Sequence, residues 1–162
     1  MKRPATIRVV RILGLDLGSK RIGLAVSDEE GSIAFPAGIL ESRGRKKDLN
    51  ALCKLIDEKS IGAAVVGLPL HMDGRRGPEA DKAITFASAL EEAAGIPVET
   101  LDERWTSMEA ERLLDAAPKR RKAARRAKGT VDEMAASIIL RTFLERRVSD
   151  PPKADYGPED SR

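Results

Sequence analysis

An aspartate inside an apolar strand constrains this chain more than any other feature of its sequence. The stretch 11–28 reads RILGLDLGSKRIGLAVSD, and its alternating pattern predicts two short strands joined by a turn at residues 18–21. Asp16 falls on the first strand, on the same face as Ile12 and Gly14. A carboxylate in such a place is costly unless a cation or several hydrogen-bond donors compensate its charge. The fold must therefore bring a compensating group to Asp16.

Length and composition predict a single globular domain. The chain has 162 residues, of which 41% are hydrophobic and 34% charged, as is typical of soluble globular proteins rather than disordered ones. Only 3% are aromatic, so we expect a core of Leu, Ile, Val and Ala. We expect the domain to span residues 1–147. The tail, residues 148–162, has three prolines and no apolar periodicity, which predicts disorder.

The sequence predicts a cytoplasmic protein. Cys53 is the one cysteine, so no internal disulfide is possible, and a reducing compartment is compatible with it. Lys2 and Arg3 lead into a segment that further arginines interrupt, so we expect no secretory signal. No apolar stretch approaches the roughly 20 residues that a membrane-spanning helix needs. We therefore expect no association with a membrane.

Three predicted strands open the chain, at about residues 9–17, 22–28 and 32–40. Tight turns join them, so we expect an antiparallel meander, and Pro36 favours an edge position for the third strand. The next segment is predicted to be a helix whose apolar stripe holds Leu49, Leu52, Cys53 and Ile56.

After this helix the pattern alternates between strands and helices, which favours parallel strands. This half contains a short apolar run typical of a strand covered on both faces, a helix and another strand, predicted at 63–67, Pro78–Gly95 and 97–101. Two further helices are predicted to begin at capping boxes, one at Thr106, running to about Leu114, and the last at Thr130.

Three acids occupy positions that a folded domain can bring together: Asp16, Glu103 and Asp132. Asp132 falls on the apolar face of the last helix, which should pack on the sheet. Converging carboxylates raise one another's pKa unless a cation relieves them. Oxygen ligands alone suit Mg²⁺ or Mn²⁺, whereas zinc prefers Cys and His. Taken singly, Asp132 also fits a favourable interaction with the helix dipole, and Glu103 an ion pair with Arg104.

Four segments resemble, in the same order, the motifs of the YqgF family, whose members are also called RuvX. They are GLDLGSKRIGLAVSD (14–28), VGLPLHMDG (66–74), LDERWTS (101–107) and VDEMAASIIL (131–140). The resemblance covers about residues 11–147. It implies the ribonuclease H-like superfold, in proteins related to Holliday junction resolvases. That is an α/β fold with a five-stranded mixed sheet, three strands antiparallel and then two parallel, flanked by helices, in line with the predicted order of strands.

The resemblance also implies a metal-dependent endonuclease that processes the 5′ end of pre-16S ribosomal RNA in ribosome biogenesis. Its catalytic residues and metal ligands would be Asp16, Glu103 and Asp132, with Mg²⁺ or Mn²⁺ as the cofactor. One alternative is resolution of Holliday junctions in branched DNA, in recombination or repair. A different class is a non-catalytic RNA-binding assembly factor. We expect a monomer or a weak homodimer.

A further class shares the Asp-x-Gly hairpin of Asp16 and Gly18, namely the actin-like ATPases. Their architecture places two such domains around a nucleotide, and a chain of 162 residues supplies one. The Walker A pattern is absent as well, because no Gly-Lys-Ser/Thr follows Gly18. The nuclease interpretation is therefore preferred.

Several residues near the proposed acids are candidates for contact with the substrate. Lys20, Arg21 and Arg104 stand beside them in sequence and could pair with phosphates. The loop 69–74, with Asp73, is expected to close over the scissile region.

A basic segment lies between the last two motifs. Residues 118–129 hold seven Lys or Arg and no acid, and the first three of these basic residues are Lys119, Arg120 and Arg121. A charge run is commonly a solvated surface. Its place between two motifs of the proposed site favours a nucleic-acid-binding arm instead.

Overall fold

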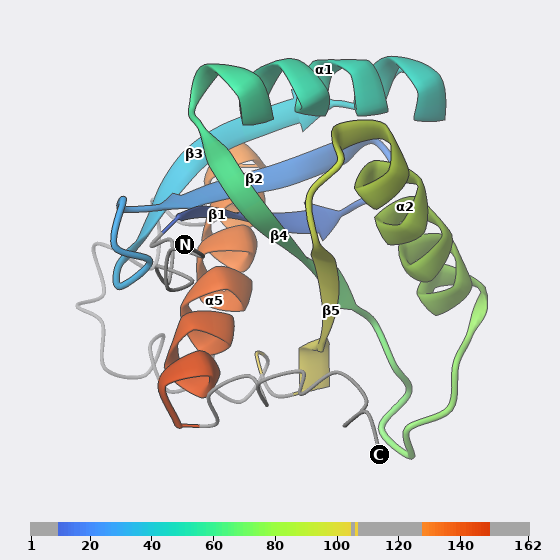
Figure 1. Cartoon of the computed structure of the whole chain (residues 1–162). Coiled ribbons are helices and arrows are strands. Elements are labelled where there is room, and N and C mark those ends of the chain that lie inside the picture. The colour runs from blue at the N-terminus through green and yellow to red at the C-terminus, as the bar shows by residue number, and fades with distance from the viewer. Residues whose placement is uncertain (1–9, 105, 107–127, 150–162) are drawn as a thin grey trace, which may run out of the picture.

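The protein is built on one five-stranded mixed sheet with the strand order β3-β2-β1-β4-β5 (Figure 1). The structure is a computed structural model, and it describes residues 10–104, 106 and 128–149, with the backbone alone for residues 128–132 and 149. In chain order the elements are β1 (Arg11–Leu17), β2 (Arg21–Ser27), β3 (Ala34–Glu41), α1 (Arg45–Glu58), β4 (Ile61–Leu68), α2 (Pro78–Ala94), β5 (Val98–Asp102) and α5 (Lys128–Ser149). β1, β2 and β3 pair antiparallel, and β4 pairs parallel with β1 and β5. The mixed sheet predicted from the sequence is confirmed.

Helices cover both faces of this sheet, α1 and α2 on one and α5 on the other (Figure 1). Alternation along β1 decides which side chains meet which helix. Leu13 and Leu15 enter the core beneath α1 and α2, whereas Ile12 packs with Ile139 and Leu140 of α5. Both cores consist almost entirely of aliphatic side chains, as expected. Asp16 continues the row that starts at Ile12, so it lies on the α5 face.

Helix α5 approaches β1 unusually closely because β1 has a glycine at the crossing point. A Cβ atom at Gly14 would lie 2.7 Å from Cβ of Leu140 and 3.0 Å from the carbonyl oxygen of Ala136. Gly14 and Ala136 are both buried. The helix backbone thus rests directly on the strand that carries Asp16.

Individual prolines and glycines in the sequence correctly predicted where several elements begin, end or lie in the sheet. Helix α2 begins at Pro78, and Gly95 ends it in the left-handed conformation (φ 67°), with its N–H bonded to the carbonyl of Glu91. Pro36 lies in the edge strand β3, where a missing N–H costs little. Cys53 is half-buried, and burial raises the pKa of its thiol, consistent with a packing residue rather than a nucleophile.

Both predicted capping boxes begin too late in the chain. Helix α5 already includes Lys128, so Thr130 lies inside it. Glu103 and Arg104 are already helical directly after β5, and the Thr106 hydroxyl donates to the carbonyl oxygen of Glu103 at 2.8 Å. The Thr106 hydroxyl thus donates back to the preceding turn, as a threonine inside a helix does, instead of capping a helix that begins there.

Some predictions lie outside the described residues. They are the helix beyond Thr106, the basic segment and the end of the tail after Ser149. Within the part of the chain that is described, no helix is both long and apolar enough to cross a membrane.

We predict that Gly14→Ala destabilises the protein by about 1–3 kcal/mol, because the added methyl group would overlap the α5 backbone. The measurement is the free energy of unfolding in urea. Alanine is otherwise about 0.5–1 kcal/mol better than glycine inside a strand. An unchanged or increased stability would therefore show that α5 does not rest on β1 as described.

Candidate active site

Two acids that are far apart in sequence meet at the carboxyl ends of β1 and β5. Asp16 is the penultimate residue of β1, and Glu103 follows β5 directly. These strands are not neighbours, because β4 runs between them, which separates them by about 10 Å. The two carboxyl groups nevertheless form a hydrogen bond with each other. Something in β4 must let one side chain pass over it.

Gly67 of β4 provides that space. A Cβ atom there would lie 2.5 Å from Oε1 of Glu103 and 2.6 Å from Cδ1 of Ile139. Glu103 therefore lies across the bare backbone of β4, beneath α5, on its way to Asp16. Any side chain at Gly67 would fill the space that Glu103 occupies.

The meeting of these acids perturbs their ionisation. Burial, and then the charge of Asp16 and the hydrogen bond with it, raise the pKa of Glu103 from 4.5 to about 7. A carboxyl group with such a pKa is one that lacks a compensating positive charge. A divalent cation placed between the two oxygens would supply that charge. The donor set is entirely oxygen, which fits Mg²⁺ or Mn²⁺.

The third predicted ligand, Asp132, is placed only in part. Its backbone lies in α5, one helical turn before Ala136, whose carbonyl oxygen faces Gly14. Its side chain lies outside what the structure describes. Among the side chains that are described, no group of three His, Cys, Asp or Glu residues could hold a metal ion. The participation of Asp132 stays a prediction.

Two more acids act on Glu103, and the sequence did not single them out. The charges of Glu79, in the first turn of α2, and of Asp102, the last residue of β5, raise its pKa further. An acid in a first turn is ordinarily explained by the helix dipole, so Glu79 carried no distinctive signal. Its contribution depends on α2 starting beside the ends of β4 and β5.

Arg104 has a partner that the sequence did not predict. Its guanidinium group donates to both carboxylate oxygens of Asp102, with distances of 2.6–3.1 Å, and to the carbonyl oxygen of Met72 at 3.4 Å. The hydrogen bonds from Arg104 lower the pKa of Asp102. Arg104 thus ties the end of β5 to the loop after β4, in addition to any contact with phosphate.

The other predicted contact residues are surface side chains. Lys20 is exposed at the tip of the β1–β2 turn, where its carbonyl oxygen accepts from the Ser42 N–H at 2.9 Å. Arg21 opens β2 and shares the α5 face with Asp16 by strand alternation. The side chain of Asp73 pairs with that of Arg75. The predicted contacts Lys119, Arg120 and Arg121 lie outside the described residues.

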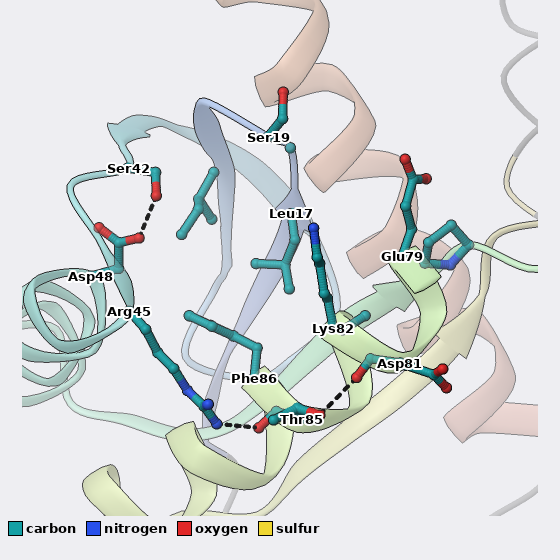
Figure 2. Close-up of a pocket in the computed structure, with 14 residues that line it drawn as sticks. Leu17, Ser19, Ser42, Arg45, Asp48, Glu79, Asp81, Lys82, Thr85 and Phe86 are labelled. Atoms are coloured by element: carbon teal, nitrogen blue, oxygen red, sulfur yellow. Dashed lines mark hydrogen bonds between the residues drawn. The ribbon is translucent and has the colours of Figure 1, made fainter. Parts of the chain in front are cut away.

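A pocket of about 620 Å³ lies on the opposite face of the same sheet end, between α1, α2 and the β1–β2 turn (Figure 2). Its two basic residues are balanced by acids: Arg45 and Lys82 share the lining with Asp48, Glu79 and Asp81. The guanidinium group of Arg45 spans the pocket to the Thr85 carbonyl oxygen at 3.2 Å. The mixed charge does not favour an anion, and neither Asp16 nor Glu103 lines it.

Sequence comparison relates the chain to a family. A model of the RuvX family, described as "Holliday junction resolvase", matches residues 10–146. A protein from Anaeromyxobacter dehalogenans (strain 2CP-C) is 47% identical over 138 residues, which are 85% of this chain and 98% of that protein. One from Desulforudis audaxviator is 40% identical over 140 residues, or 86% of this chain and 97% of that one. Both are named "Putative pre-16S rRNA nuclease".

Solved structures share the fold at low sequence identity. RuvC from T. thermophilus, in complex with a Holliday junction substrate, has a TM-score of 0.58 and 14% identity, covering 87% of this chain and 97% of that chain. The fowlpox virus resolvase in complex with Holliday junction DNA has a TM-score of 0.50 and 12% identity, covering 84% and 97%. The predicted ribonuclease H-like α/β fold is confirmed.

We predict that Asp16→Asn raises the melting temperature of the metal-free protein at pH 8 by roughly 2–8 °C, because it removes a repulsion equivalent to about 1–2 kcal/mol. The pKa of Glu103 is above its ordinary value, so its unfavourable effect grows as the pH rises from 4.5 to about 7. The difference between variant and wild type should therefore shrink towards pH 4.5. Differential scanning fluorimetry in chelator measures it.

Two controls complete this measurement. Asp57→Asn, at an exposed acid of α1, should leave the melting temperature almost unchanged. Added Mg²⁺ should raise the melting temperature of the wild type and not that of Asp16→Asn. Equal responses of wild type and variant to Mg²⁺ would exclude Asp16 as a ligand.

Proposed function

Because the chain belongs to the RuvX family, we propose that it is a divalent-metal-dependent nuclease that processes the 5′ end of pre-16S ribosomal RNA. The observation that carries this proposal is the contact between Asp16 and Glu103 across Gly67. Two carboxylates held together without a cation have no structural benefit, since their repulsion opposes folding. Their benefit lies in what they bind.

In this proposal Asp16, Glu103 and Asp132 hold Mg²⁺ or Mn²⁺. When bound, the ion supplies Lewis-acid stabilisation of the charge that grows on the scissile phosphate. Asp16 contributes its carboxylate from a rigid central strand, and Glu103 reaches it from the end of β5. Helix α5 excludes water from one side of the pair, because Ile139 packs against the same backbone at Gly67.

The residues around this centre would bind the substrate chain. Lys20 and Arg21 lie at the β1–β2 turn, which directly follows the strand that carries Asp16. They would contact phosphates beside the scissile one. Arg104 holds the loop after β4 through the carbonyl of Met72. The basic segment of residues 118–129 would add contacts with the RNA backbone further away. A nuclease with these roles would act in the cytoplasm, together with the precursor RNA.

Branched DNA is the second candidate substrate. The description of the matching family model favours it, because that model is named for Holliday junction resolution. The names of the relatives with 40–47% identity favour ribosomal RNA. A non-catalytic assembly factor would retain RNA binding without cleavage, and a cleavage assay separates it from both nucleases.

We predict that Asp16→Asn abolishes Mg²⁺- or Mn²⁺-dependent cleavage of pre-16S RNA while the protein stays folded. The assay incubates purified protein with the RNA, and separately with a four-way DNA junction, in Mn²⁺ and in chelator. Asp57→Asn changes the charge equally at a distant exposed position and should cleave like the wild type. Undiminished cleavage by Asp16→Asn would overturn the assignment, and no cleavage by the wild type would favour the assembly factor.

We also predict that replacing Lys119, Arg120, Arg121 and Lys122 with Ala weakens RNA binding and flattens its dependence on salt. Every cation that no longer neutralises a phosphate of single-stranded RNA lowers the slope of log K against log salt by about 0.7. Binding titrations at several salt concentrations measure this slope. If the slope is unchanged, the segment is solvated surface and does not contact the RNA.

A further inference from the structure

The loop between β4 and α2, residues 69–77, is internally bonded rather than open. Its backbone closes on itself through His71 N–H to the Arg75 carbonyl at 3.0 Å and Gly74 N–H to the His71 carbonyl at 2.8 Å. Leu70 and Arg76 form an antiparallel bridge across it. The loop is therefore a small preformed hairpin.

A second set of contacts anchors this hairpin beside the candidate active site. The Met72 carbonyl accepts from Arg104, which is itself held by Asp102 and directly follows Glu103. Gly74 adopts φ 87°, and a Cβ atom there would lie 3.3 Å from Nη1 of Arg104, so the backbone packs closely on the guanidinium group. That this loop closes over the scissile region stays a prediction; in the structure its backbone is already bound to Arg104.

At the tip of the hairpin an apolar side chain is exposed to solvent. Met72 is 90% exposed; among the other described large apolar side chains, Val148 near the end of α5 is 85% exposed, and Ile33 and Phe35 at the opposite sheet edge are 56% and 52% exposed. Ordering a backbone costs free energy, and here that order presents a methionine to solvent rather than burying it. Arg75 and Arg76 follow on the same hairpin and are also exposed. Arg75 pairs with Asp73, but both side chains of this ion pair are exposed, so the pair is weak and a phosphate can replace the carboxylate.

We infer that Met72 packs against an unpaired base of the substrate RNA next to the scissile phosphate, with Arg75 and Arg76 contacting the adjoining phosphates. A flexible, polarisable thioether suits packing against any base face, and apolar side chains of this kind contact or separate bases in nucleic-acid complexes. Guanidinium groups pair well with phosphate. The inference rests on the proposed nuclease function and makes the hairpin its base-contacting element.

The experiment measures base stacking and binding separately from cleavage. Precursor RNAs carrying a single 2-aminopurine at successive positions across the 5′ end are bound, in Mg²⁺, to the Asp16→Asn protein and to the same protein with a second substitution. Binding should change the fluorescence at one or two positions. The added change Met72→Ala should remove this signal and weaken binding about tenfold, and Met72→Leu should largely preserve both.

The matched control is Ile33→Ala, which removes another exposed apolar side chain, at the far edge of the sheet. Folding does not confound the comparison, because a side chain that is 90% exposed makes little contact with the core. If Met72→Ala behaves like Ile33→Ala in both readings, the inference is wrong. Cleavage that still requires Asp16 would then leave the nuclease function intact, so the two failures are distinguishable.

Discussion

The repulsion between Asp16 and Glu103 is the interaction on which the rest of this structure depends. Two carboxyl groups from strands that are not neighbours can touch only if the strand between them has no side chain at that place, and Gly67 meets this condition. The register of the parallel β4–β5 pair must also place the end of β5 beside the end of β4, so that Glu103, which follows β5, lies next to Gly67. Because burial strengthens the repulsion, the surrounding packing has to supply the stability that the pair removes. The aliphatic cores on both faces of the sheet do this.

A second glycine, Gly14 of β1, also makes room for a neighbour, because it lets α5 rest on the strand backbone. Without that approach the α5 face would be open to water, and the field between the carboxyl groups would be screened. The two glycines thus act at different points of one arrangement: Gly67 makes room for a side chain, and Gly14 makes room for a helix. An exposed pair of acids would bind a cation weakly, whereas a half-covered pair retains a strong need for one.

Local pattern was enough to predict an antiparallel meander followed by parallel strands, and alternation put Asp16 on the face opposite Leu15. The five-stranded mixed sheet came from the motif resemblance, and the place of β4 beside β1 was not predicted. Position in the chain made Glu103 a candidate partner of Asp16, and the motif resemblance implied its role as a metal ligand. The roles of Gly67 and Glu79 could not be predicted, because they depend on which strand lies between the acids and where α2 begins in space. The capping boxes at Thr106 and Thr130 did not mark the helix starts, because the chain is already helical at Glu103 and Lys128, and a local capping pattern does not fix the exact end of a helix. The roles of Asp132 as a metal ligand and of the basic segment as an RNA-binding arm still rest on the sequence alone.

Arg104 changes the expected distribution of charge around the site. From sequence it is a cation beside an acid and hence a candidate for binding phosphate. In the fold its guanidinium group is bound to Asp102, whose charge adds to those of Asp16 and Glu79 in raising the pKa of Glu103. An arginine so engaged neutralises the nearest surplus acid and fixes the Met72 carbonyl. Positive charge for an incoming phosphate must then come mainly from elsewhere. Among the described residues, exposed cations lie at the β1–β2 turn and on the loop after β4, where the ion pair of Arg75 with Asp73 is far more exposed than that of Arg104 with Asp102 and hence weaker. The substrate path implied by this arrangement crosses the ends of β1 and β4, over the two carboxyl groups, from Lys20 towards Arg75.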